Sequence, residues 1–342
     1  MRIHIYTILD LKEWIYHNTQ NGLDTYLISN ARALALIQNP CAEDSDPAIA
    51  IAYDEYDNAV GYTAVLADIW HGKKIFFGTT GFIDASMRGK GVGTRLYFAM
   101  MEACGNRWFA SDSAPAALTI SKKTGLGIYY FERYYLKFSY SKKSLMSLAR
   151  SWYVKRKNNN VYKHLKSTTR LEILRYIDTE TYRFIEQYSK FDIFQRSQAM
   201  LNWILQNPFK ATAPKDLATY SKYDFTTALP QYMIYAFRIT MEKKIIGFAM
   251  FRLNMGDLVL LYLYKDNNYT EEVHTSLLKH ILEQDICQFR TFDKSLLNYF
   301  ESVGAVSMNA KSRVQQISLS VPAGVSIDNS LTLQGGDGDM FC

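Results

Sequence analysis

The order of apolar and polar positions in the first 141 residues predicts alternating strands and helices. Apolar runs at 48–53 and 60–69 flank the polar turn 54–58, which indicates a hairpin, and a third strand is expected at 75–83. Apolar residues recur at helical spacing over 94–103. We therefore expect a mixed, mostly antiparallel sheet flanked by helices. The other expected elements are strands at 2–8, 107–111 and 136–140 and helices at 11–17, 27–38 and 115–123.

Residues 142–170 have a different character. They are rich in Lys and Arg and have few apolar runs beyond 145–153. We expect a basic connecting segment that contains one amphipathic helix. A solvated linker is the plainer interpretation, and a helix that lies on a membrane surface is the alternative.

The second half of the chain resembles the first. Residues 246–250 match 60–64 in character, and residues 273–277 match 92–96. The order of expected elements agrees as well, which predicts a structural duplication. A further match joins Phe109 to Asp112 with Phe289 to Asp293, each followed by a helix that ends in glycine, Gly125 and Gly304.

Composition changes this picture little. A chain of 342 residues is long enough for two domains, and 48% hydrophobic with 21% charged residues is typical of a folded protein. The net charge of +6 suits a protein that handles a polyanionic small molecule and is too small for a nucleic-acid-binding protein. We therefore expect no nucleic-acid partner.

The cysteines and the apolar runs indicate a cytoplasmic protein. The four cysteines are far apart and lack the spacing of a zinc site or a disulfide framework, so free thiols are expected. The N-terminus lacks the apolar region of a signal peptide, and no run approaches the roughly 20 apolar residues of a membrane-spanning helix.

The segment Arg88-Gly89-Lys90-Gly91-Val92-Gly93 joins an expected strand to an expected helix. Its glycines allow the backbone to approach a ligand closely, and the first turn of the helix offers unpaired N–H groups and partial positive charge. A diphosphate is the natural ligand for such a turn. A Walker loop would need Gly-Lys-Ser/Thr, and a dinucleotide-binding turn would need a different glycine spacing. A tight turn without a ligand is the remaining alternative.

Residues 1–140 resemble the GNAT family of N-acetyltransferases. The family's coenzyme motif, Arg/Gln-x-x-Gly-x-Gly/Ala, is matched by Arg88, Gly91 and Gly93 within the family's order of elements. The resemblance implies that acetyl-CoA is the co-substrate and that backbone N–H groups from Lys90 to Thr94 hold its pyrophosphate. It also implies that the strand ending at Phe82-Ile83 pairs with the pantetheine arm, as an added strand would.

The chain departs from the family pattern at the catalytic groups. Many members place a tyrosine four residues before the glycine that ends the late helix, to protonate the leaving thiolate, and Ser121 stands there. The motif strand carries no glutamate, so Asp84 just beyond it and Asp112 are the nearby candidate bases. Direct attack of an amine on the thioester needs no metal, and none is expected.

The second half lacks the coenzyme motif. The corresponding stretch, 266–272, contains no glycine and carries three acidic residues, which is the wrong charge for a pyrophosphate. We expect a degenerate second domain that walls the acceptor site. The expected units are a GNAT-like acyl-CoA-binding domain at 1–141, the basic connecting segment at 142–170, the degenerate GNAT-like domain at 171–325 and a tail at 326–342.

The C-terminal tail combines glycines with Asp337 and Asp339. A disordered end is the plain expectation. The alternative is that the tail enters the cleft between the domains and lends one of these carboxylates to the acceptor site. Deleting residues 335–342 would then abolish acyl transfer and leave the melting temperature nearly unchanged.

The sequence thus predicts an acyl-CoA-dependent N-acyltransferase with two tandem GNAT-like domains. The expected acceptor is an amine on a small metabolite, an amino sugar or a peptide. Two alternatives stay open. One is a non-catalytic protein that binds or senses acyl-CoA, and the other is a transferase that uses aminoacyl-tRNA, similar to the Fem transferases.

Overall fold

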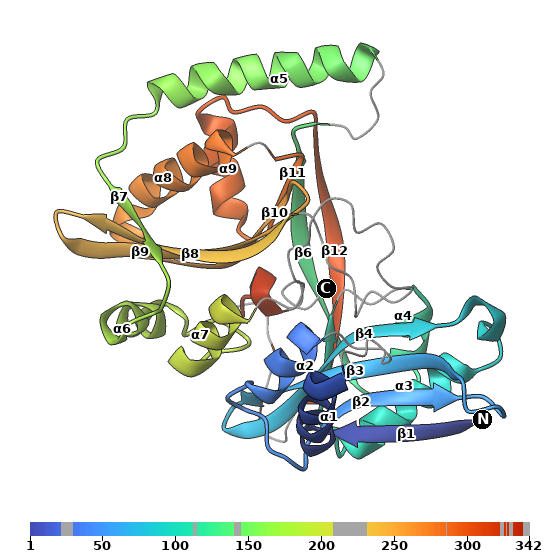
Figure 1. Cartoon of the computed structure of the whole chain (residues 1–342). Coiled ribbons are helices and arrows are strands. Elements are labelled where there is room, and N and C mark those ends of the chain that lie inside the picture. The colour runs from blue at the N-terminus through green and yellow to red at the C-terminus, as the bar shows by residue number, and fades with distance from the viewer. Residues whose placement is uncertain are drawn as a thin grey trace.

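A computed structural model gives the fold of the chain. It describes residues 1–21, 30–111, 115–139, 145–207, 231–284, 286–321, 325, 327 and 331–337. The described strands form one 12-stranded sheet in the order β1-β2-β3-β4-β5-β12-β6-β11-β10-β9-β8-β7. Its two ends curve apart into a lower and an upper half (Figure 1).

The first half runs from β1 to β6 and is followed by the long helix α5 (Leu145–His164). Its central strands β2 and β3 are nearly continuous apolar runs that are buried on both faces, because helices cover both faces of the sheet. Its elements are β1 (Arg2–Thr7), α1 (Ile8–Asn21), α2 (Asn30–Ile37), β2 (Pro47–Tyr53), β3 (Ala59–Trp70), β4 (Lys73–Ile83), the short helix η1 (Ala85–Met87), α3 (Val92–Ala103), β5 (Trp108–Ser111), α4 (Pro115–Ser121) and β6 (Gly127–Lys137).

The second half repeats this order element by element. A short helix follows the fourth strand in both halves, and in both halves an aspartate caps it, Asp84 for η1 and Asp266 for η3. The second-half elements are β7 (Arg170–Leu174), α6 (Thr179–Tyr188), α7 (Gln198–Gln206), β8 (Tyr232–Met241), β9 (Lys244–Asn254), β10 (Asp257–Lys265), η3 (Asn267–Tyr269), α8 (Thr270–Glu283), β11 (Gln288–Thr291), α9 (Lys294–Ser302) and β12 (Asn309–Leu319), followed by the short helix η4 (Gly335–Asp337).

The two halves exchange their last strands. β12 pairs with β5 of the first half, where β6 would be expected, and β6 pairs with β11 of the second half, where β12 would be expected. Along their length β6 and β12 pair with each other, from Asn309 opposite Lys137 to Leu319 opposite Gly127. These two strands run side by side between the halves (Figure 1).

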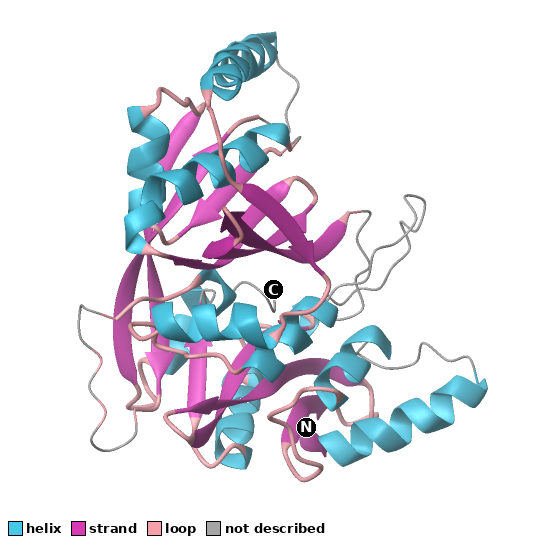
Figure 2. Ribbon diagram, turned by 90° about the vertical axis from the view of Figure 1, so that its left-hand side faces the viewer, coloured by secondary structure: helices cyan, strands magenta, loops and turns pink. Residues whose placement is uncertain are grey.

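Apolar side chains form a core shared by the halves and two outer cores. The shared core gathers α1 and α2 with α6 and α7 between the two ends of the sheet. Two buried indoles tie it together: Trp203 donates to the Ala35 carbonyl and Trp70 to the Ile193 carbonyl, each over 2.8 Å. Helix α3 covers the outer face of the first half, and α8 with α9 covers that of the second. Figure 2 shows the helices on both sides of the strands.

The predicted duplication, the mostly antiparallel sheet and the helix in the connecting segment are confirmed. The predicted last strand of the first half, at 136–140, is wrong in its bounds. The strand spans Gly127–Lys137 instead, because the aromatic stretch before it is itself extended, as aromatic residues favour. The predicted helix at 27–38 is described from Asn30 onward.

Candidate functional site

Strand β4 leaves the neighbouring strand β5 after a short ladder. The two parallel strands pair at only two positions, Phe76 with Trp108 and Phe77 with Phe109. Beyond Phe77 the register against β3 shifts between Thr63 and Val65, which marks a bulge in β4. Among the described residues, no strand pairs with the edge of β4 from Gly78 to Ile83 on the side of β5, where the two strands leave a gap in the sheet.

The 88–93 turn follows at the end of this edge. Gly89 and Gly91 both have φ of +78°, a conformation that other residues rarely adopt, and a Cβ on either would meet no atom within 4 Å. Gly91 is the N-cap of α3, and no side chain caps this helix, whereas Asp178, Ser197 and Asp293 cap α6, α7 and α9. The first N–H groups of α3 are thus open to an anion.

Basic side chains surround the turn. Arg88, Lys90 and Arg95 lie in or just after it. Arg88 is exposed and donates from Nε to the Ile83 carbonyl over 3.1 Å, which fixes its stem at the end of β4. Together with the helix dipole these side chains make the turn electropositive.

Asp84 begins the turn and caps η1. Its carboxylate accepts from the backbone N–H and the hydroxyl of Ser86, each over 3.1 Å. It lies five residues beyond the bulge at Thr79, which is roughly 16 Å along an extended strand. Because Asp266 caps η3 in the same way in the other half, this geometry favours a structural role for Asp84. Its role as a base stays a prediction.

Ser121 is fully buried at the end of α4 and pairs with a tyrosine that the sequence did not single out for chemistry. Its Oγ lies 3.0 Å from the hydroxyl of Tyr97, which α3 contributes. Burial raises the pKa of Tyr97, so this phenol keeps its proton. The pair offers an O–H donor where a lone serine would be a poor acid. In the sequence, the helical spacing of apolar residues assigns Tyr97 to the apolar face of α3, so nothing in the pattern indicated its contact with Ser121.

The remaining candidate carboxylates divide into two groups. Asp112 and Asp339 lie outside the described residues. Asp337 is fully buried between the halves, where its Oδ1 accepts from Arg196 over 3.0 Å and its Oδ2 from the Gln334 backbone N–H over 3.0 Å. Arg196 also forms an ion pair with Asp68 of β3. The Asp337 carboxylate is thus engaged by the protein itself.

The corresponding region of the second half has a different structure. Helix α8 begins directly after η3 at Thr270, so no glycine turn separates them, and its first turn carries Glu271 and Glu272. The gap between β10 and β11 is entered by η4. There a Cβ at position 335 would overlap the carbonyl oxygen of Leu260, so only glycine allows this approach.

Within the ranges that the structure describes, no group of three or more His, Cys, Asp or Glu side chains is arranged to hold a metal ion. No described helix is both long and apolar enough to span a membrane.

Comparison with solved structures identifies the fold. The structure of a tandem GNAT protein from the clavulanic acid biosynthesis pathway has a TM-score of 0.52 and 10% identity to this chain, covering 94% of this chain and 99% of that one. A GCN5-related N-acetyltransferase from Anabaena variabilis gives 0.47 at 11% identity, over 92% of this chain and 72% of its own. A putative acetyltransferase from Pyrococcus horikoshii gives 0.48 at 11% identity, over 94% and 89%.

The sequence matches no protein-family model and no curated protein. The fold assignment therefore rests on the likeness to the tandem protein, which extends over nearly the whole of both chains, and on the repeated element order described above. The chain has the fold of the GNAT N-acetyltransferases in two tandem copies.

Proposed function

We propose that the chain is an acyl-CoA-dependent N-acyltransferase that holds its coenzyme in the first half. One observation carries the proposal: the edge of β4, which no described strand pairs with beyond Phe77 on the side of β5, leads through a turn with two positive-φ glycines to the N-terminus of α3, which no side chain caps. The pantetheine arm pairs with the edge from Gly78 to Ile83, including Phe82, as an added strand. The backbone N–H groups from Lys90 to Thr94 hold the pyrophosphate.

The proposed reaction is direct transfer to an amine. The nitrogen bonds to the thioester carbonyl carbon, the C–S bond breaks, the nitrogen loses a proton to a base and the thiolate takes one from an acid. Asp112 is the leading candidate base, ahead of Asp84. The hydroxyl pair of Ser121 and Tyr97 is the candidate acid.

The finer assignments belong to the same proposal. The acyl group is acetyl, the acceptor is an amine on a small metabolite, an amino sugar or a peptide, and the protein works in the cytoplasm. The domain bounds are 1–141, 142–170, 171–325 and 326–342, with the last strands exchanged. The second half walls the acceptor site and holds no coenzyme of its own.

Calorimetric titration with acetyl-CoA tests the coenzyme site. Gly91→Val is expected to weaken binding at least tenfold, because it opposes the positive φ and places a branched side chain where the pyrophosphate lies. Gly304→Val is the matched control, since Gly304 has φ of +77° and equally open surroundings in the second half. Unchanged affinity in a Gly91→Val variant with native circular dichroism would remove the assignment.

Thiol release over a panel of amines then tests catalysis. Release that needs both acetyl-CoA and an amine supports the transferase. Tight binding of acetyl-CoA without release for any amine supports instead a non-catalytic acyl-CoA-binding protein. Transfer that requires aminoacyl-tRNA and ignores acetyl-CoA would place the chain with the Fem-like enzymes.

A further inference from the structure

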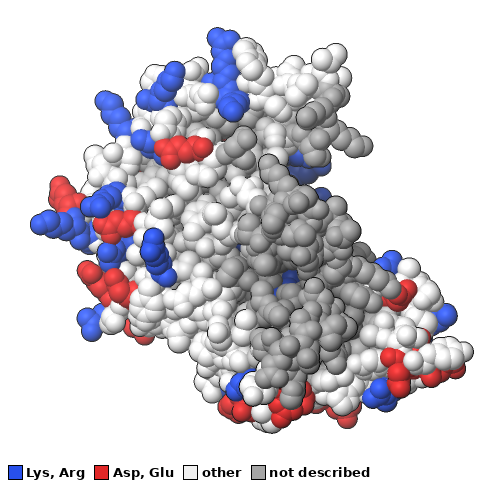
Figure 3. Space-filling model, viewed as in Figure 1, with Lys and Arg blue, Asp and Glu red and all other residues white. Residues whose placement is uncertain are grey.

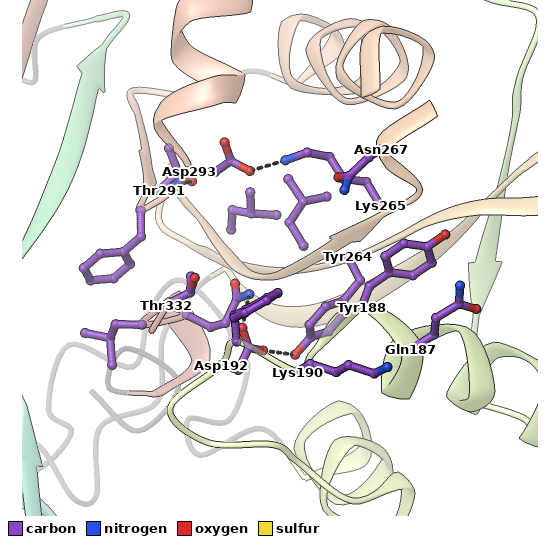
Figure 4. A pocket seen from close by; sticks show the side chains of 17 residues that line it. Gln187, Tyr188, Lys190, Asp192, Tyr264, Lys265, Asn267, Thr291, Asp293 and Thr332 are labelled. Carbon is purple, nitrogen blue, oxygen red and sulfur yellow. Dashed lines mark hydrogen bonds and ion pairs between the residues drawn. The ribbon is translucent and has the colours of Figure 1, made fainter. Parts of the chain in front are cut away.

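A cavity of about 540 Å³ lies in the second half. Its walls come from β10, the ends of α6 and β11, the segment after α6 and the C-terminal segment from Thr332 to Gly335. Figure 4 shows side chains from these elements pointing into it. The cavity corresponds in position to the gap beside β4 in the first half, but η4 and the start of α8 replace the features that would hold a coenzyme there.

The cavity contains a buried carboxylate that makes no ion pair with any described residue. Asp192 is 6% exposed and lines the wall. It accepts from the hydroxyl of Tyr264 over 2.7 Å and from Nε2 of Gln334 over 3.0 Å, and both of these donors are neutral. None of the ion pairs found within the described ranges includes Asp192 (Figure 4).

The described charged side chains around Asp192 do not supply a counterion. Burial, together with the negative charge of Asp337, raises the pKa of Asp192 to about 8. Lys265 is engaged by Asp293, whose Oδ2 lies 2.6 Å from its Nζ. Lys190 lies exposed on the rim, and the buried phenols of Tyr262 and Tyr264 on β10 stay protonated because burial raises the pKa of each.

One part of the wall is apolar and aromatic, beside polar side chains such as Gln187, Asn267 and Thr291. Tyr188, Phe191, Phe292 and Leu263 line the cavity around the polar group. Aromatic rings attract an adjacent ammonium through their faces and cover the apolar part of a ligand. A buried carboxylate beside aromatic side chains is an arrangement that suits an organic amine.

We propose that this cavity binds a small organic cation, with a primary ammonium at Asp192 and an apolar body against the aromatic walls. Binding makes one ion pair, and Asp192 releases its proton to solvent as the pair forms. This site is separate from the coenzyme turn and does not depend on acyl transfer. It gives the degenerate half a role in binding.

Calorimetry on the full chain tests the site with 2-phenylethylamine and its neutral counterpart 2-phenylethanol. At pH 7 we expect the amine to bind at least tenfold more tightly than the alcohol. Titration in two buffers of different ionisation enthalpy should show close to one proton released per amine. Equal binding of the two compounds, no binding of the amine, or binding without proton release would each overturn the proposal.

Variants assign the binding to this cavity. Asp192→Asn keeps the shape of the side chain and is expected to lower amine affinity at least tenfold and to remove proton release. Glu186→Gln, an exposed carboxylate of α6 outside the cavity, is the matched control and should change neither. Amine binding that persists unchanged in Asp192→Asn places the amine elsewhere and overturns the proposal. If Asp192→Asn does not fold, the number of protons that the unmodified protein releases per bound amine still tests the proposal.

A second, independent feature is the outer face of α5. The helix packs on the second half through Val154 and Asn158, and the Asn158 side chain both donates to and accepts from the Val306 backbone over 2.9 Å. Its N-terminal turns leave apolar side chains in solvent: Leu145 is 88% and Trp152 62% exposed. The others are Met146, Leu148 and Tyr153.

The charged residues of α5 itself are all positive. The helix contains no Asp or Glu, and Arg156 lies over the ring of Trp152 at 5.3 Å and Lys157 over that of Tyr153 at 5.9 Å. Figure 3 shows basic side chains along the top edge of the molecule, where α5 lies in the same view. The further basic residues of the helix are Arg150, Lys155 and Lys163.

We infer that α5 lies on an anionic membrane surface. Exposed Trp, Tyr and Leu side chains enter the interface between headgroups and acyl chains, and the flanking Lys and Arg side chains pair with anionic headgroups. The charge of the helix complements such a surface and would repel a second copy of itself. The helix rests on the membrane through one face and stays attached to the second half through the other.

Cosedimentation with vesicles tests this inference. We expect at least fivefold more protein on phosphatidylcholine vesicles that contain phosphatidylserine than on phosphatidylcholine alone, with release by salt. The double substitution Leu148→Glu with Trp152→Glu should abolish binding, whereas Tyr56→Glu, at a side chain 79% exposed in the first half, should not. Equal binding to both kinds of vesicle, or no binding, would overturn the inference. So would self-association of the unmodified protein that disappears in the double variant, because the helix would then contact a second copy of the chain.

Discussion

Arg196 and Asp337 form a buried ion pair across the interior, with 3.0 Å between Nη2 and Oδ1 and 141 positions between them in the sequence. The Arg196 side chain is 3% exposed and that of Asp337 is fully buried. Asp68 of β3 pairs with the same guanidinium. One arginine of the second half therefore joins a strand of the first half to the C-terminal segment.

Asp337→Asn should destabilise the protein, because it removes one partner of a buried pair while the guanidinium stays buried. We expect a loss of about 3 kcal/mol in the free energy of unfolding, measured by urea denaturation. Asp57→Asn is the control, since Asp57 pairs with Arg2 at the same 3.0 Å but is 79% exposed. That change should cost less than about 0.5 kcal/mol. Equal effects of the two variants would contradict this account.

Deletion of residues 335–342 should lower the melting temperature by more than Asp337→Asn does. It removes η4 from the gap beside β10 as well as the partner of Arg196. This expectation replaces the sequence-based one, in which the deletion left the melting temperature nearly unchanged. A thermal scan of the truncated chain measures it, and a melting temperature equal to that of the full chain would show that η4 adds no stability.

The chain should bind one molecule of acetyl-CoA. The second half lacks the glycine turn, carries Glu271 and Glu272 at the start of α8 and has Gly335 packed beside Leu260 where a pantetheine arm would lie. Titration calorimetry at known active protein concentration measures the stoichiometry. Saturation at two per chain would show that η4 leaves the gap and that α8 tolerates a pyrophosphate.

Much of this fold was predictable because its signals are local. The turn at 88–93 needs glycines for a backbone reason, so the requirement is visible in the sequence. The repeat was visible through pairs such as Gly61 and Gly247, which lie opposite the last residues of β4 and β10, Ile83 and Lys265. Each of these features depends on residues that are close together in the sequence.

The exchange of β6 and β12 was not predictable in this way. Both strands alternate side chains across a sheet, so either partner satisfies the same pattern. The ladder between them pairs residues as distant as Gly127 and Leu319, and the Arg133 side chain donates to Gln315, 182 positions away. The cluster around Arg196 was hidden for a related reason, because a charged residue that is buried looks the same in sequence as one that is exposed.

Substitutions in the hydroxyl pair should separate catalysis from coenzyme binding. Tyr97→Phe and Ser121→Ala each remove one member of the pair at 3.0 Å. We expect each to lower the rate of thiol release at least tenfold, because general acid catalysis contributes about 10²–10⁴-fold. The affinity for acetyl-CoA should stay within about twofold of the unmodified protein. Tyr16→Phe, a tyrosine 66% exposed on α1, is the control. Full activity in both Tyr97→Phe and Ser121→Ala would show that neither hydroxyl protonates the thiolate and that water is the acid.

The stability of the protein should depend on pH through Asp192. Its pKa is raised to about 8 in the folded protein, from 3.8 for the free side chain, mainly by burial. Between these values the folded state holds one proton more than the unfolded state, so the stability contributed by this group is full below about pH 4 and is lost as the pH rises toward 8. The slope is at most about 1.4 kcal/mol per pH unit.

Asp192→Asn should remove this dependence. We expect the difference in unfolding free energy between the unmodified protein and Asp192→Asn to shrink by up to about 4 kcal/mol from pH 5 to pH 8. Burial raises the pKa of Asp337 too, and both proteins retain that group, so the comparison reports Asp192 together with its electrostatic coupling to Asp337. Urea denaturation at several pH values gives the two curves, with Glu186→Gln as a variant whose curve should run parallel to the unmodified one. A difference that stays constant with pH would mean that Asp192 is ionised throughout, and it would also overturn the proposed amine site, whose binding step releases that proton.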